Sequence, residues 1–146
     1  MTASTAPSPG LTWGDVAAQL TGLAHVATAS ADGEPHVAVV APVLEGDGLW
    51  IFTMRSSRKA RNLAANPRIS LMWRPQSEIY LTADAELVDS ADDKARLWAR
   101  TDLPFDPAGF FGSPDNPDFV LVRVTPRRAV VMGPPTGRSV WSAAAG

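Results

Sequence analysis

The sequence predicts a mainly β protein, an antiparallel barrel with a few peripheral helices. First, seven short segments are rich in β-branched and aromatic residues and are separated by turn signals. Second, several of these segments are joined by tight turns, which pair neighbouring strands antiparallel. Third, the length of 146 residues fits one domain with its own hydrophobic core. Many short antiparallel strands in one small domain favour a closed or nearly closed barrel.

The predicted elements begin with a short helix and continue with a series of strands. Thr12 can cap the helix, and Asp15 follows at its third position, where a carboxylate suits the helix dipole. The Asp32-Gly33 pair marks the first hairpin, because both residues tolerate the positive φ of a tight turn. The predicted strands cover residues 25–31, 35–44, 49–54, 69–73, 79–88, 119–124 and 129–132.

Two further helices interrupt the strands. The second helix begins after Ser56 or Ser57 and ends at Asn66-Pro67, since proline cannot continue a helix and restricts the residue before it. The third helix begins at Ser90, which can cap it. A long loop is expected over residues 103–118.

The expected domain organisation is simple. Residues 1–10 are small, polar and proline-rich and read as a flexible N-terminal tail. Residues 11–133 form the barrel domain. Residues 134–146 read as a loose C-terminal tail with Trp141 as its one candidate anchor.

Composition excludes several classes of protein. The net charge of −2 argues against a general nucleic-acid binder, which would carry a basic excess. Cysteine is absent, so disulfides, thiol catalysis and thiolate metal sites are excluded. No apolar run of about 20 residues predicts a transmembrane helix. We therefore expect a cytoplasmic protein with no membrane partner.

No metal site is expected. The two histidines, His25 and His36, do not make a zinc site without further ligands at suitable spacing. Asp115, Asn116 and Asp118 lack the remainder of a calcium loop, so they are interpreted as loop residues. His36 is either a cofactor-side residue or a half-exposed strand residue.

The stretch with the clearest chemistry is the start of the second helix. Three cations, Arg55, Arg58 and Lys59, surround Ser56 and Ser57 where the preceding strand ends. Cations, hydroxyls and free backbone N–H groups at a helix start can together bind an anion. The alternative interpretation is a solvated basic helix start.

These residues also carry a family resemblance. Phe52-Thr53, Ser57-Arg58-Lys59 and the segment NPRISL at residues 66–71 resemble the core motif of pyridoxamine-phosphate-oxidase-like proteins, the FMN-binding split barrels. The hairpin over residues 32–35 resembles the same family. The segment over residues 115–126 resembles its general stress protein 26 branch. The resemblance implies a six- to seven-stranded antiparallel split β-barrel with short helices.

The resemblance implies a homodimer with the flavin FMN at its interface. Phe52 and Thr53 match positions that contact the flavin and its ribityl chain. Arg58 and Lys59 match the phosphate-binding cations, and Ser57 adds a hydroxyl. The strand that runs along the isoalloxazine ring, largely through backbone contacts, is matched by Val37, Ala38, Val39, Val40 and Ala41. Arg55 is a further candidate cation, and Trp73 ends a strand expected to reach the partner's cofactor.

The sequence departs from true pyridoxamine phosphate oxidases. Ala38 and Val43 stand where those enzymes carry an arginine and a lysine, and no Arg-x-His substrate motif occurs near the C-terminus. We therefore expect an oxidoreductase acting on an unidentified small substrate, with no catalytic side chain assigned.

Two alternatives stay open. The first is a reductase of the same fold that uses the deazaflavin F420, whose acidic tail would need Arg55, Arg61 or Arg74. The second is a non-catalytic stress protein that binds flavin or haem. Phe110 and Phe111 in the long loop either cover a ligand or anchor the loop to the barrel.

Overall fold

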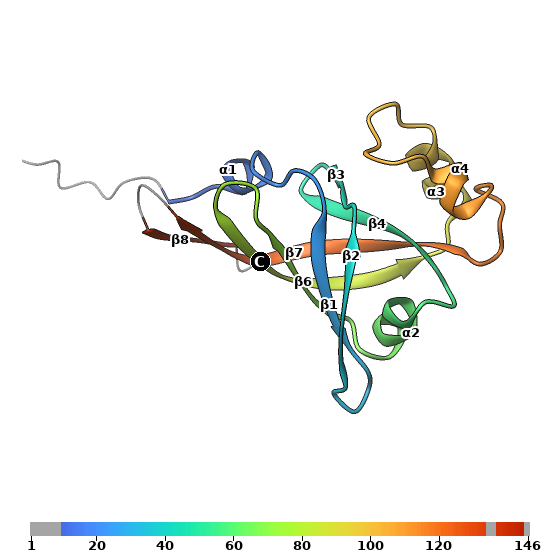
Figure 1. The fold of residues 1–146 in the computed structure, drawn as a ribbon, viewed down its shortest axis with the longest axis horizontal. Coiled ribbons are helices and arrows are strands. Elements are labelled where there is room, and N and C mark those ends of the chain that lie inside the picture. The colour runs from blue at the N-terminus through green and yellow to red at the C-terminus, as the bar shows by residue number, and fades with distance from the viewer. Residues whose placement is uncertain (1–9, 134–136, 145–146) are drawn as a thin grey trace, which may run out of the picture.

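The computed structural model describes residues 10–133 and 137–144, which form one curled β-sheet with helices at its ends (Figure 1). The strands are β1 (Ala24–Ala29), β2 (Pro35–Val40), β3 (Val43–Glu45), β4 (Gly48–Met54), β5 (Arg68–Trp73), β6 (Glu78–Val88), β7 (Phe119–Gly133) and β8 (Gly137–Ser142). The helices are α1 (Trp13–Ala17), α2 (Arg58–Ala65), α3 (Ala91–Trp98) and α4 (Pro107–Phe111).

The sheet is antiparallel throughout its described pairs. Its strand order is β2-β1-β5-β6-β7-β4-β3, and β8 pairs with β7 off this path. In Figure 1, β1 and β2 run steeply across β4, β6 and β7, so the sheet curls over itself. The predicted fold class, a mainly β antiparallel split barrel with short helices, is confirmed.

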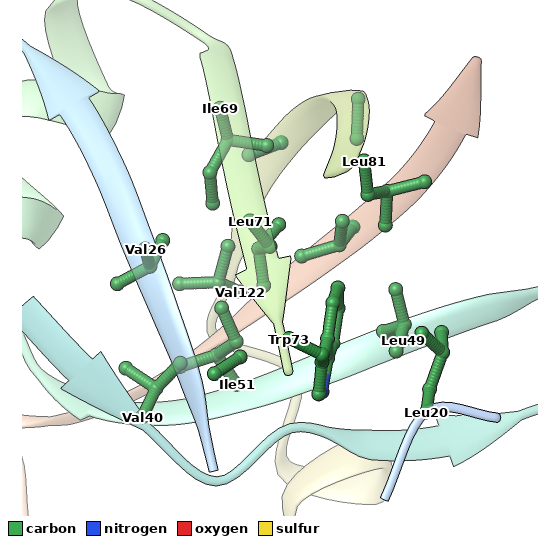
Figure 2. Close-up of a cluster of buried hydrophobic side chains, with 14 of the residues drawn as sticks. Leu20, Val26, Val40, Leu49, Ile51, Ile69, Leu71, Trp73, Leu81 and Val122 are labelled. Carbon is green, nitrogen blue, oxygen red and sulfur yellow. The ribbon is translucent and has the colours of Figure 1, made fainter. Parts of the chain in front are cut away.

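The main hydrophobic core fills the inside of the curled sheet. It is built from alternate residues of six strands, such as Val26 on β1, Leu71 and Trp73 on β5, and Leu81 on β6 (Figure 2). Strand side chains alternate between the two faces, so each strand contributes every second residue. The outward-facing residues between them are partly or fully exposed.

Strand β4 differs because it is buried on both faces. Leu49 and Ile51 point into the main core, whereas Trp50 and Phe52 belong to a second hydrophobic cluster. This second cluster packs the α3 side of the molecule and the loop after it onto β4 and β7. A continuous apolar run is the pattern expected of a strand with no solvent-facing side.

Helix α2 lies against β1 on the edge of the barrel. Its N-cap is Ser57, whose hydroxyl accepts a hydrogen bond from the backbone N–H of Ala60 at 3.2 Å. The buried Asn62 donates to the hydroxyl of Thr28 on β1 at 3.0 Å. This bond and the buried Leu63 fix how the helix sits on the sheet.

Three boundaries differ from the sequence prediction. The strand expected over residues 35–44 is split into β2 and β3 around Pro42, whose missing N–H interrupts the ladder. The two strands expected over residues 119–132 are one strand, because a register shift opposite Thr82 and Ala83 accommodates the chain around Pro126. The long loop contains α4, which Asp106 caps.

The C-terminal segment is a correction. Residues 134–146 were expected to be loose, but Gly137–Ser142 forms β8 and pairs with β7. Trp141 packs on the main core and against Trp13, with ring centroids 5.1 Å apart. Aromatic burial thus holds the strand in place. The tail expected at residues 1–10 lies, apart from Gly10, outside the described residues.

Among the described helices, none combines the length and apolar character needed to span a bilayer.

Candidate functional site

A cavity of about 520 Å³ opens where the ends of β2 and β4 meet the start of α2 and the segment around α4. Its apolar lining consists of Leu23, Val39, Val40, Ala41, Phe52, Met54, Pro104, Phe105, Phe110 and Phe111. Its polar lining consists of Thr53, Ser57 and Lys59. Small-molecule sites in proteins have this size and composition, a mainly apolar wall with a few convergent polar groups.

The three polar residues gather in one corner of the cavity. Thr53 ends the buried part of β4, and its hydroxyl lies 3.1 Å from that of Ser57, the cap of α2. Lys59 follows in the first turn of the helix. We call Thr53, Ser57, Arg58 and Lys59 the anion corner, because hydroxyls and cations occur together at the first, unpaired N–H groups of a helix. Arg58 is exposed and is not part of the cavity lining.

The charges in this first turn are the reverse of those that stabilise a helix. Acidic residues are favoured at a helix N-terminus because they complement the dipole. Helix α1 has Asp15 there and α3 has Asp92 and Asp93, as expected. Helix α2 instead has two cations, Arg58 and Lys59, and no acidic residue in its first turn. The arrangement costs stability unless an anion is bound.

The pKa of Lys59 also indicates that its charge is unfavourable in the folded protein. Its side chain is half-buried, and burial lowers the pKa of its ammonium group below the usual value. No ion pair joins Lys59 to any residue within 10–133 or 137–144. An anion in the corner would supply the missing partner.

The opposite wall of the cavity is aromatic. Phe52 on β4 contacts Phe105 edge-on, with centroids 5.2 Å apart, and Phe111 at 6.2 Å. Phe111 also packs on the fully buried Phe119 at 5.0 Å, so it anchors the α4 segment to the barrel. Phe110 is 70% exposed at the cavity. Of the two alternatives considered for these phenylalanines, Phe111 fulfils the anchoring of the loop.

The structure brings together seven of the residues predicted from the sequence. The predicted residues that line the cavity are Val39, Val40, Ala41, Phe52, Thr53, Ser57 and Lys59. Arg58 lies at the exposed first position of α2, beside Lys59. Val37 is exposed on the outer face of β2, and Ala38 packs toward the main core.

Arg55 is directed elsewhere. Its guanidinium is 2.8 Å from the carboxylate of Asp89, which also pairs with Lys94. These two cations lower the pKa of Asp89, mainly through the hydrogen bond from Lys94. The described structure thus shows Arg55 bound to the start of the α3 segment rather than to the cavity.

Trp73 is a correction to the predicted site. Its side chain is only 1% exposed and lies within the main core, next to Leu49 (Figure 2). The enclosed ring belongs to the core of the barrel and does not line the cavity. The alternation of Ile69, Leu71 and Trp73 along β5 indicates this inward face.

Sequence reasoning missed four lining residues, which are Leu23, Met54, Pro104 and Phe105. Leu23 and Phe105 are 82 positions apart, so no local pattern links them. A second cavity of about 520 Å³ contains Arg74 and Glu78 but none of the predicted site residues. No cluster of three potential metal ligands occurs among the residues the structure describes.

The fold and the cavity define a split-barrel protein with an anion corner at the end of a buried strand. The sequence profile of the pyridoxamine 5'-phosphate oxidase family matches residues 17–132. This match covers most of the chain, and the protein belongs to that family.

Two curated relatives are pyridoxine/pyridoxamine 5'-phosphate oxidases. The one from Alcanivorax borkumensis is 33% identical over 79 residues, which are 51% of this chain and 38% of that protein. The one from Anaeromyxobacter dehalogenans is 38% identical over 80 residues, 53% of this chain and 40% of that protein. The matched region therefore spans about two fifths of each oxidase.

Solved structures share the fold at low sequence identity. The general stress protein 26 of Bacillus anthracis superposes with a TM-score of 0.70 at 18% identity, covering 90% of this chain and 98% of that one. A haem-binding protein of Mycobacterium smegmatis gives 0.69 at 21%, covering 87% and 55%. An F420 reductase gives 0.57 at 24%, covering 73% and 87%.

Replacing Lys59 with methionine tests the unpaired cation. Because the folded protein lowers the pKa of Lys59, its charged form destabilises the fold at every pH below that pKa. The Lys59→Met variant should therefore melt at or above the temperature of the unsubstituted protein at pH 7. Differential scanning calorimetry measures this. Lys94→Met is the control, since Lys94 is paired with Asp89 and its loss should lower the melting temperature. A clear drop for Lys59→Met would show a stabilising partner instead.

Replacing Trp73 with phenylalanine tests its reassignment to the core. The smaller ring leaves part of a packed volume empty, so the free energy of unfolding should fall by roughly 1–3 kcal/mol. Ligand affinity at the cavity should not change. Denaturant unfolding and a flavin titration measure the two effects. A loss of flavin affinity without a loss of stability would show that Trp73 does belong to the binding site.

Proposed function

We propose that this protein binds FMN, with its phosphate in the anion corner and its ring system along the apolar walls of the cavity. The observation that carries the proposal is the pair of adjacent cations, Arg58 and Lys59, at a helix start where stability alone favours acidic residues. Arginine holds phosphate oxygens through two parallel hydrogen bonds, and lysine adds a point charge. Membership in the pyridoxamine 5'-phosphate oxidase family supports the same ligand.

The residues present fit the chemistry of such a ligand. The hydroxyls of Thr53 and Ser57 lie beside the cations and can bind ribityl or phosphate oxygens. The phenylalanines opposite them suit a planar ring, because aromatic surfaces stack well on one another. Bound FMN would supply the redox chemistry, while the chain binds, orients and shields it.

The proposed activity is that of an oxidoreductase acting on a small molecule, and no side chain is assigned a catalytic role. The proposal does not include pyridoxamine phosphate as substrate. Ala38 and Val43 stand where pyridoxamine phosphate oxidases carry an arginine and a lysine. Phe110, exposed at the mouth of the cavity, is available to contact a substrate.

FMN is favoured over F420 by the position of the nearby cations. The acidic tail of F420 would need positive charge beyond the phosphate site. Of the three cations considered for that tail, Arg55 is paired with Asp89 at 2.8 Å and Arg74 lines a different cavity, so only Arg61 is left. Haem is not favoured either, because no histidine is part of the cavity lining.

Titration of the purified protein with FMN and F420 tests the assignment. We expect quenching of flavin fluorescence and tight binding of FMN. The Arg58→Ala/Lys59→Ala variant should bind FMN at least about 100-fold more weakly, since two charge-assisted contacts are lost. Arg61→Ala/Arg68→Ala is the matched control, because it removes two exposed cations that lie outside both the cavity lining and the first two positions of α2. Equal FMN affinity in both double variants would refute the phosphate site, and binding of F420 alone would favour the deazaflavin alternative.

We further propose that the protein is a homodimer formed through the outer face of β2, β1, β5 and β6. Val37 and Val39 on the edge strand β2 are 66% and 57% exposed. The strand register places Val39 in one row with His25, Met72 and the exposed Tyr80. Exposed apolar side chains such as Val37 and Val39 on an edge strand indicate an interaction surface.

A charge on this face of the sheet should prevent association. Val37→Glu places a carboxylate on the face without touching the cavity lining. We expect light scattering coupled to size-exclusion chromatography to report twice the monomer mass for the unsubstituted protein and the monomer mass for the variant. Thr125→Glu, an exposed residue of β7, is the control and should remain dimeric. A monomeric unsubstituted protein would contradict the proposal.

A further inference from the structure

The segment Asp115-Asn116-Pro117-Asp118 connects α4 to β7 and lies beside the cavity without lining it. Its sequence is polar, yet two of its side chains are only partly exposed. Both make hydrogen bonds to segments that do line the cavity. The segment was considered above as a cation site, but these bonds instead connect two parts of the cavity wall.

Asn116 holds the aromatic wall. Its side-chain amide donates to the backbone carbonyl of Phe111 at 2.9 Å. Its side-chain oxygen accepts from the backbone N–H of Asp118 at 3.0 Å. Pro117 between them has a restricted φ and favours an extended residue before it, which limits the shapes that this link can take.

Asp118 binds the link between β4 and α2, which consists of residues 55–57. Ser56 in this link is 62 residues away from Asp118 in the sequence. Its carboxylate accepts from the backbone N–H of Ser56 at 3.1 Å and from the Ser56 hydroxyl at 2.7 Å. Its backbone carbonyl accepts from the N–H of Arg55 at 2.6 Å. Two of the three N–H groups in the link thus end on Asp118, and the third, of Ser57, ends on Met54.

The bonds form one continuous chain from Phe111 through Asn116, Asp118 and Ser56 to the cap of α2. We propose that Asn116 and Asp118 are positioning residues, a strap that sets the separation between the aromatic wall and the anion corner. The inference rests on the proposed function, since it concerns one ligand that occupies both walls. A rigid link between the walls reduces the ordering that binding would otherwise require.

The strap predicts that the two parts of the ligand respond to different residues. Riboflavin has the ring and ribityl chain of FMN but lacks the phosphate, so the ratio of the two affinities isolates the anion corner. Asp118→Asn keeps the shape of the side chain and removes its charge. It should lower the FMN-to-riboflavin affinity ratio about tenfold and leave riboflavin binding within about twofold, because the carboxylate hydrogen bonds to Ser56 are weakened.

Asn116→Ala should lower both affinities and leave their ratio unchanged. Loss of the bond to Phe111 loosens the aromatic wall, so riboflavin and FMN should both bind several-fold more weakly at an unchanged ratio. Asp115→Asn is the matched control for charge. Its carboxylate is exposed, forms no ion pair with the described residues, and should leave both affinities unchanged.

The outcomes separate the strap from a merely structural role. If Asp118→Asn lowers the melting temperature but keeps the affinity ratio of the unsubstituted protein, the strap is refuted. If Asp118→Asn fails to fold, Ser56→Ala removes the hydroxyl half of the same contact and should lower the ratio by a smaller factor. An unchanged ratio in Ser56→Ala then refutes the strap.

A failure of the proposed function is recognised separately. If the unsubstituted protein binds FMN no better than riboflavin, the phosphate site itself is wrong. Hydrogen exchange of the backbone amides of residues 56–60 then tests, without any ligand, whether Asp118 restrains the start of α2. Faster exchange in Asp118→Asn than in Asp115→Asn supports the strap, and equal exchange refutes it.

Discussion

The burial of β4 on both faces is the constraint on which the rest of the structure depends. Leu49 and Ile51 join the main core, and Trp50 and Phe52 join the second cluster. The strand is therefore fixed from two sides by close packing, which resists displacement. The cavity begins at the end of this strand, so its floor rests on one of the most restrained segments of the molecule.

Stability and binding are in conflict where β4 gives way to α2. The rest of the chain follows the usual rules, with capped helices and acidic first turns at α1 and α3. At α2 two cations occupy the positive end of the helix, and Lys59 is half-buried with a lowered pKa. Local violations of folding rules of this kind concentrate at functional sites.

The sequence predicted best those features that depend on neighbouring residues. The hairpin at Asp32-Gly33 and the Ser57 cap formed as expected, because turn and cap geometry involve only a few consecutive residues. Trp73 was misplaced although the alternation along β5 indicated an inward face. β8 was missed because the glycines and prolines near it are typical of a loop, whereas burial of Trp141 holds the strand.

By itself, the sequence determined the fold class, most of the strands and the cluster of cations at the start of α2. Each of these follows from side-chain periodicity or capping, which act within a few residues. Only the tertiary structure decided that Leu23, Val39 and Phe105 enclose one cavity and that Asp89 holds Arg55 away from it. Such contacts join segments far apart in the chain, and they exist only once the sheet has curled and packed.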